Sequence, residues 1–175
     1  MDSNNIKQEI LSFLKDFCMW GITTFLVFLF VFQAICVSGS SMDNTLHDGN
    51  LLIGTRINRE YHRGDIVVAK TTSQGNTRYI IKRVIGVPGD HIVIDYLYGN
   101  VYINGEIIDE PYIREKMQYS GWGEMELTFD ISEDCLFLMG DNRNRSLDSR
   151  EIGEVPIKDI SSRIIWSLVP FKNVE

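Results

Sequence analysis

The sequence has little cysteine, with three residues in 175. Cys18 and Cys36 fall within an uncharged apolar segment, so Cys135 is the only cysteine in the rest of the chain. No internal disulfide can form there, and that part of the chain must fold around a hydrophobic core. A disulfide-free domain outside the cell is compatible with this count, although the count does not establish one.

Histidine is also scarce, and its spacing matches no known metal motif. His47, His62 and His91 are scattered single residues, and no cysteine–histidine set has the spacing of a zinc site. Surface positions are the simplest interpretation of all three. We expect no metal and no cofactor.

Clustered positive charge is absent as well. The chain has 17 basic and 24 acidic residues and a net charge of −7. Residues 38–175 hold 15 of the basic and 21 of the acidic residues, without a stripe of lysine and arginine. Because phosphates demand clustered cations, we expect no nucleic-acid partner.

One long hydrophobic run lies near the start of the chain. Residues 17–37 are 21 positions without a charge, about 30 Å as a helix, which matches the core of a bilayer. The run is longer than the apolar region of a cleavable signal peptide, and no clean small-x-small site follows it. We predict a short segment at 1–16, with an amphipathic pattern, and an uncleaved transmembrane helix at 17–37.

Flanking charge does not orient this span. Lys7 and Lys15 precede it, while Arg56 and Arg59 follow within about 20 residues, so the positive-inside bias is nearly absent. The function of the domain that follows must decide the orientation.

From residue 38 onward the chain alternates in hydrophobicity and turns at short intervals, without repeats or low-complexity tracts. Asn104-Gly105 is a strong hairpin signal between Tyr102-Ile103 and Glu106-Ile107. We predict a mainly β domain at 38–175, a folded sheet or barrel with one inserted lobe at about 99–134. The lobe is rich in acidic residues, which we interpret as a solvated surface. The strand-like runs are Leu51–Ile53, Ile66–Lys70, Tyr79–Val87, His91–Tyr96, Val101–Ile103, Cys135–Met139 and Ile160–Leu168.

Three segments carry groups suited to chemistry. The first is Ser38–Leu46, directly after the apolar run, where small residues around Ser41 would let a substrate backbone approach closely. The same composition also fits an ordinary turn after a helix.

The second segment, Thr77–Asp90, has Lys82 and Arg83 side by side within an apolar strand. Strand side chains alternate between faces, so one of the two should point inward. A buried Lys82 would have a lowered pKa and could act as a base. The alternative is that Lys82 faces water and Arg83 lies inside, paired with a carboxylate.

The third segment, Gly140–Arg150, has a high density of charged and hydroxyl side chains after an apolar strand. A serine or carboxylate here could orient a neutral lysine amine. A surface turn and an acidic metal loop are alternatives, although three arginines argue against metal.

In this order and after an apolar span, these segments resemble the bacterial type I signal peptidases of the Gram-positive sort, a family of Ser–Lys serine proteases. Residues 39–46 match the serine box G-x-S-M-x-P-T-L, residues 63–67 match Arg-Gly-Asp-Ile-Val, residues 82–90 match the lysine box, and residues 140–150 match G-D-N-R-x-x-S-x-D-S-R. The resemblance covers about residues 17–170. One departure is Asn44, where the family has proline, and we expect Asn44→Pro to preserve stability or raise it modestly.

The resemblance implies the roles of individual residues. Ser41 would be the nucleophile, neutral Lys82 the general base, and the Ser41 backbone N–H an oxyanion donor. Ser146 would orient the lysine. The supporting groups would be Asp148 with Arg150, and Asp141 and Arg83 on the scaffold.

It also implies a substrate and a location. Signal peptides of exported preproteins would bind by strand addition, with small residues at −1 and −3 as in Ala-x-Ala. The pocket-lining residues would be Ile35, Val37, Met42, Leu46, Ile80 and Ile81, although core packing, or bilayer contact for Ile35, is the simpler interpretation. Ser41 lies within about 14 Å of the end of the apolar run, the depth at which the cleavage site of a signal peptide emerges from the membrane. The domain would therefore be extracytoplasmic and segment 1–16 cytoplasmic, with the site beside the lipid bilayer and near the protein-export machinery.

Two rival hypotheses remain. One is a Ser-His-Asp hydrolase that uses His47 or His91. The other is a non-catalytic, membrane-tethered β domain that assists surface-protein assembly, for which Asn44 is the only support.

Overall fold

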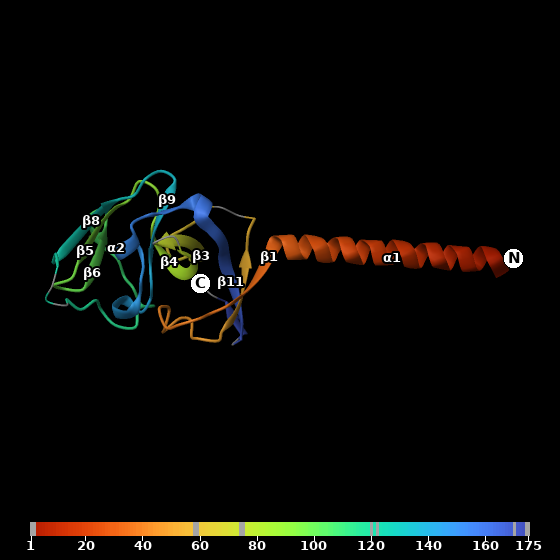
Figure 1. Cartoon of the computed structure of the whole chain (residues 1–175), viewed down its shortest axis with the longest axis horizontal. Coiled ribbons are helices and arrows are strands. Elements are labelled where there is room, and N and C mark those ends of the chain that lie inside the picture. Colours follow the sequence, from red (N-terminus) through yellow and green to blue (C-terminus); the bar gives the residue numbers. More distant parts are fainter. Residues whose placement is uncertain are drawn as a thin grey trace.

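The structure, a computed structural model, describes residues 3–57, 60–73, 76–119, 121, 123–169 and 171–173. Arg59 and the extreme ends of the predicted segments 1–16 and 38–175 lie outside these ranges. The described chain forms one long N-terminal helix followed by a β-rich domain (Figure 1).

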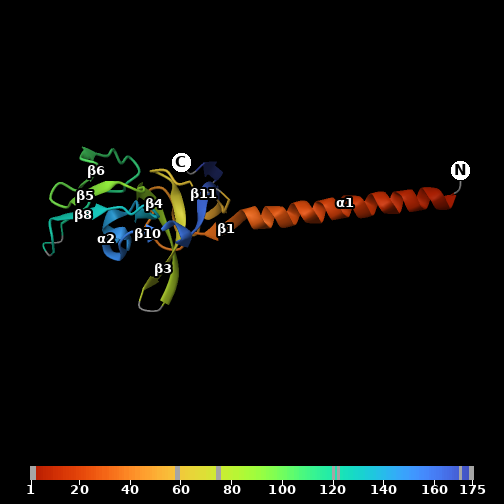
Figure 2. The same cartoon turned by 90° about the horizontal axis from the view of Figure 1, so that it is seen from above.

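Helix α1, Ser3–Val31, is continuous, so the predicted amphipathic segment and the start of the predicted span form one element. It extends away from the domain in both views (Figures 1 and 2). Its stretch Lys7–Val31 has a window of mean hydropathy 1.7, none of it buried in the protein. By length and composition, α1 can cross a bilayer.

The predicted helix end at residue 37 is wrong. The helix stops at Val31, and Phe32–Cys36 forms strand β1, antiparallel to β2, Leu51–Thr55. Val37 N then donates to Asn50 O at 2.9 Å, and the Val37 side chain is buried in the domain core. An uncharged apolar run does not by itself distinguish a helix from a buried strand. Here strand pairing and core burial determine the outcome.

The main sheet has eight strands, and all its pairings are antiparallel, which confirms the prediction of a mainly β domain. Its order is β1-β2-β11-β3-β4-β9-β10, with β12 paired to β11. Their bounds are β3 Ile66–Ser73, β4 Asn76–Gly86, β9 Cys135–Met139, β10 Val155–Pro156, β11 Ile160–Val169 and β12 Phe171–Asn173. Short helices η1 Arg143–Arg145, α2 Ser149–Ile152 and η2 Ile157–Asp159 connect the last strands.

A second sheet of four strands forms the predicted lobe. Its order is β7-β6-β5-β8, with bounds β5 His91–Asp95, β6 Asn100–Ile103, β7 Glu106–Ile107 and β8 Glu126–Asp130. The lobe therefore begins at β5 and not at residue 99, because β5 pairs with both β6 and β8. The predicted hairpin is confirmed: Asn104 and Gly105 have φ of 53° and 84°, and Ile103 pairs with Glu106.

Both faces of strand β4 are covered, which decides where its two cations lie. Directly opposed residues of paired strands share a face. Lys82 is opposite Val67 and Arg83 is opposite Ile66, and these two apolar partners belong to different buried clusters. Neighbouring side chains on β4 are therefore both buried, and Lys82 and Arg83 are each only 3% exposed.

Candidate active site

Ser41 and Lys82 lie in direct contact. Ser41 starts a tight turn after β1, in which Leu46 N donates to Met42 O at 2.8 Å. The Lys82 amine on β4 donates to Ser41 Oγ at 2.7 Å and to Ile81 O at 3.0 Å. A hydroxyl within hydrogen-bond reach of a buried amine is the geometry required of a nucleophile and its base.

The environment of Lys82 makes its amine easier to deprotonate. Burial lowers the pKa of Lys82 from 10.5 to about 8, against the attraction of the carboxylates of Asp148 and Asp141, which raise it. Arg150 adds a smaller lowering. In mildly alkaline solution a large fraction of the amine can therefore accept a proton.

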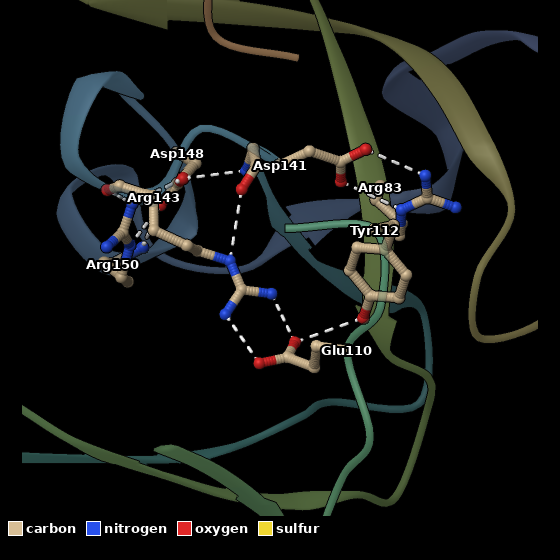
Figure 3. Close-up of polar contacts among 8 residues, drawn as sticks. Arg83, Glu110, Tyr112, Asp141, Arg143, Asp148 and Arg150 are labelled. Carbon is tan, nitrogen blue, oxygen red and sulfur yellow. Dashed lines mark hydrogen bonds and ion pairs between the residues drawn. The ribbon is translucent and has the colours of Figure 1, made fainter. Parts of the chain in front are cut away.

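Arg83 holds the other face of β4 through a buried ion pair (Figure 3). Its Nε and Nη2 donate to the two oxygens of Asp141 at 2.9 and 2.8 Å, and its Nη1 donates to Gly64 O at 2.8 Å. Thr45 Oγ1 donates to Asp141 Oδ2 at 2.5 Å. The two alternatives considered for Lys82 and Arg83 therefore combine: both cations are buried, and Arg83 has the carboxylate partner.

The 140–150 segment forms a polar network around a second ion pair. Arg150 donates from Nε and Nη2 to Asp148 at 2.8 and 2.9 Å, and Gly140 N donates to Asp148 Oδ2 at 3.0 Å. Burial alone would raise the pKa of Asp148, but these bonds and the charge of Arg150 hold it below its usual range. Asp148 therefore stays ionised at neutral pH.

The same segment fixes the backbone of Ser41, through Asn142, to which the sequence analysis assigned no role. Asn142 N donates to Ser41 O, and Asn142 Nδ2 donates to Ser40 O, both at 3.0 Å. Its place within a matched motif could have marked Asn142 as a candidate. Its role was not predictable, because its partners lie about 100 residues away in the chain.

Ser146 lies next to Gly140, and its buried hydroxyl is one of the groups that hold the pKa of Asp148 low. A Cβ atom added at Gly140 would collide with Ser146 Oγ and would lie 2.5 Å from Ser41 O. The Ser146 hydroxyl and the Ser41 backbone thus lie against the same glycine, Gly140. The role of Ser146 in orienting Lys82 stays a prediction.

A groove of about 190 Å³ opens beside Ser41 and Lys82. It contains five of the six apolar residues predicted to contact substrate, while Leu46 is fully buried beneath the turn as a core residue. Ile35, for which bilayer contact was the alternative, is partly buried and packs against the hydrophobic cluster that includes Leu46. Four lining residues were not predicted. Cys36 and Ser38 flank Val37 in sequence, Tyr79 precedes Ile80 on β4, and Val68 lies on the paired strand β3. The lining is Ile35, Cys36, Val37, Ser38, Ser41, Met42, Val68, Tyr79, Ile80, Ile81 and Lys82.

Both walls of the groove present strand edges. Strand β1 is at the end of the main sheet, and β4 pairs with β9 only from Arg83 onward. Residues 76–82 of β4 therefore keep one edge unpaired within the described sheet. An extended peptide can hydrogen-bond to such edges.

The histidines lie away from this contact. His47 Nδ1 is 3.4 Å from Asp43 Oδ1, and His91 Nδ1 is 2.6 Å from Asp130 Oδ1, with both rings substantially exposed. None of His47, His62 and His91 lines the groove or hydrogen-bonds to Ser41 in the described structure. The geometry gives no support to a Ser-His-Asp triad.

Asn44 is held in a conformation that proline cannot adopt, so the expectation that Asn44→Pro is tolerated is wrong. Its φ is 101°, whereas proline is fixed near −65°. Its Nδ2 also donates to Tyr112 O at 3.0 Å and to Ile113 O at 3.4 Å. This turn therefore differs from one built around proline, and its asparagine links it to the lobe.

We predict that Asn44→Pro lowers the free energy of unfolding by more than about 1 kcal/mol, because the ring forces φ out of its native range. Chemical denaturation of the detergent-solubilised protein measures this. Asn44→Gly is the matched control, since glycine can keep the backbone conformation and loses only the hydrogen bonds of the Asn44 side-chain amide. A proline variant as stable as the glycine variant would contradict the positive φ.

Known proteins resemble this chain over most of its length. The model of the family described as "Signal peptidase, peptidase S26" matches residues 10–169. The chain is 34% identical to a signal peptidase I of Bacillus licheniformis, over 98% of this chain and 95% of the relative. It is 37% identical to a signal peptidase I of Bacillus caldolyticus, over 82% and 83%. A crystal structure of a signal peptidase I from Enterococcus faecalis V583 is 28% identical with a TM-score of 0.48, covering 59% of this chain and 95% of that one.

Proposed function

Because the chain belongs to the signal peptidase family, peptidase S26, we propose that it is a membrane-bound serine endopeptidase that removes signal peptides from exported preproteins. Ser41 is the nucleophile and neutral Lys82 is the general base. The observation that carries this proposal is the 2.7 Å contact between Nζ of the buried Lys82 and Ser41 Oγ, at the wall of the groove. The lowered pKa of Lys82 supports it.

The reaction follows from that contact. Lys82 Nζ takes the proton of Ser41 Oγ as the oxygen attacks the scissile carbonyl, and the backbone N–H of Ser41 stabilises the developing oxyanion. The lysine ammonium then protonates the leaving amine, and an acyl-enzyme remains on Ser41. Lys82, neutral again, deprotonates the water that releases the signal peptide. Ser146 orients the amine, and the two buried ion pairs hold the scaffold.

The substrate lies in the groove as an added strand between β1 and the free edge of β4. Small side chains at −1 and −3, as in Ala-x-Ala, fit its shallow apolar walls. Ile35, Val37, Met42, Ile80 and Ile81 are the contacts that select them. Leu46 supports this surface from below.

Helix α1 anchors the enzyme in the membrane as a single pass. In our proposal its N-terminus is cytoplasmic, and the β domain lies on the outer side, where preproteins emerge beside the export machinery. The short chain distance between Val31 and Ser41 supports this placement, because it keeps the nucleophile close to the bilayer surface. The intact Ser41–Lys82 contact weighs against a non-catalytic domain.

The test uses the full chain in detergent with a preprotein that bears an Ala-x-Ala site. Wild type should release the mature protein with its N-terminus directly after that site, as read by mass spectrometry. Ser41→Ala should leave the preprotein intact. Processing by Ser41→Ala at the wild-type rate, or cleavage elsewhere, would overturn the proposal.

A further inference from the structure

A five-residue segment of the lobe reaches back to the catalytic pair. Residues 110–114, Glu-Pro-Tyr-Ile-Arg, follow the hairpin of β6 and β7 and carry no regular secondary structure. We call this segment the strap. It lies outside every matched motif of the sequence, yet it contacts three separate parts of the site.

Tyr112 connects the strap to the strand of the base. Its ring lies over the guanidinium of Arg83, with 4.1 Å from Cζ to the ring centroid (Figure 3). Arg83 is the residue next to Lys82, and its guanidinium already forms a bidentate pair with Asp141. The ring covers one face of that guanidinium, a favourable placement for a cation.

Glu110 connects the strap to the polar 140–150 segment. Its carboxylate accepts from both terminal nitrogens of Arg143, and the two side chains are 6% and 1% exposed. Arg143 Nε in turn donates to Gly140 O at 3.1 Å. Tyr112 Oη donates to Glu110 at 3.1 Å, and burial, together with the charge of Glu110, raises the pKa of that phenol, so the donor proton is retained.

The strap backbone meets the nucleophile's turn. Tyr112 O and Ile113 O accept from Asn44 Nδ2. Arg114 N donates to Asp141 O at 3.1 Å. The nucleophile's turn, the base's strand and the polar segment are far apart in sequence, and the strap touches all three.

We propose that Glu110 and Tyr112 are positioning residues, which set the alignment of Ser41 and Lys82 through Arg83 and Arg143. The proposal rests on the proposed function, because it assigns these residues to the same catalytic pair. Neither residue lines the groove, so their removal should leave substrate binding intact. A displacement of about 1 Å between reacting groups can cost about 10²-fold in rate.

The first test compares Tyr112→Leu with Tyr112→Phe in the full-length enzyme, using a peptide with an Ala-x-Ala site. Leucine removes the ring from Arg83, and we expect kcat to fall by about tenfold or more with KM within about twofold of wild type. Phenylalanine keeps the ring and should restore kcat to within a few-fold of wild type. Tyr98→Leu, at an exposed turn of the lobe, is the matched control and should leave both constants unchanged.

A second variant separates positioning from stability. The double variant Glu110→Met/Arg143→Met removes both buried charges together, a replacement that often leaves stability unchanged or raises it. Circular dichroism and thermal melting establish that it is folded. A fall in kcat of about tenfold in a folded double variant supports the proposal, and it decides the matter should Tyr112→Leu fail to fold.

Three results would overturn the strap's role: wild-type kcat in both variants, a loss confined to KM, or equal losses in Tyr112→Leu and Tyr112→Phe. Wild type and Ser41→Ala are assayed alongside. An inactive wild type would contradict the proposed function itself. An active wild type and an inert Ser41→Ala, with wild-type kcat in both Tyr112→Leu and the double variant, would contradict the role of the strap alone.

Discussion

Replacing Lys82 by methionine should abolish catalysis and, at pH 7, stabilise the folded protein. Loss of a general base that acts as a unit with its nucleophile typically lowers kcat by about 10⁴-fold or more. Methionine fills a similar volume in a position that is 3% exposed. It also removes a charge that burial disfavours. A variant that is inactive because of poor folding would instead be less stable.

The gain in stability should depend on pH in a defined direction. The pKa of Lys82 is about 8 when folded, against 10.5 ordinarily, so between these values the unfolded chain binds the proton more strongly. The free energy of unfolding of the wild type should therefore rise between pH 8 and 10.5. This difference between the folded and unfolded pKa corresponds to about 3 kcal/mol. The stability advantage of Lys82→Met over wild type at pH 7 should therefore be smaller by about that amount at pH 10.5.

Chemical denaturation of both proteins at pH 7 and near pH 10.5 measures this, because groups common to both cancel in the difference. Ser41→Ala is the control: it should lose activity without a pH-dependent gain in stability. A Lys82→Met enzyme with wild-type turnover, or one less stable than wild type at pH 7, would contradict a buried lysine base.

Replacing Asp141 by asparagine should have the second large effect, this time on stability. Its two oxygens hold the buried Arg83 and accept from Thr45, and both members of the ion pair are nearly inaccessible to solvent. The neutral amide leaves the guanidinium charge buried and unpaired, which costs about 3–5 kcal/mol. That is a large fraction of the 5–15 kcal/mol typical of a folded domain.

Urea denaturation, followed by tryptophan fluorescence, measures the loss. Asp130→Asn is the matched control, because its carboxylate pairs with His91 at the surface and should contribute less than about 1 kcal/mol. Equal stabilities for the two variants would show that the buried charge of Arg83 does not need Asp141 as its partner.

Local patterns predicted much of this molecule from sequence. Alternating side chains located seven strands from Leu51 onward, and Asn104-Gly105 fixed one hairpin, since both signals depend only on near neighbours in the chain. Strands β8, β10 and β12 were not predicted. The motif residues Ser41 and Lys82 were identified by their resemblance to the family and lie in contact. That Lys82 and Arg83 are both buried required knowing that the sheet is covered on two sides.

The features that escaped prediction depend on distant partners. Phe32–Cys36 is a strand because Leu51–Thr55 pairs with it. Asn44 has a positive φ in a turn that also bonds to Tyr112 O, 68 residues away. Glu110 gave no local signal, because Arg143, its partner, is 33 residues farther along the chain.

The pH dependence of kcat/KM for an Ala-x-Ala peptide tests the central claim most directly, since it reports the ionisation of the base in the free enzyme. With neutral Lys82 as the base, the rate should rise through an acidic limb with an apparent pKa of about 8 and persist in alkaline solution. A limb centred near 6.5, the ordinary value of histidine, that persists in Lys82→Met would contradict the Ser41–Lys82 pair.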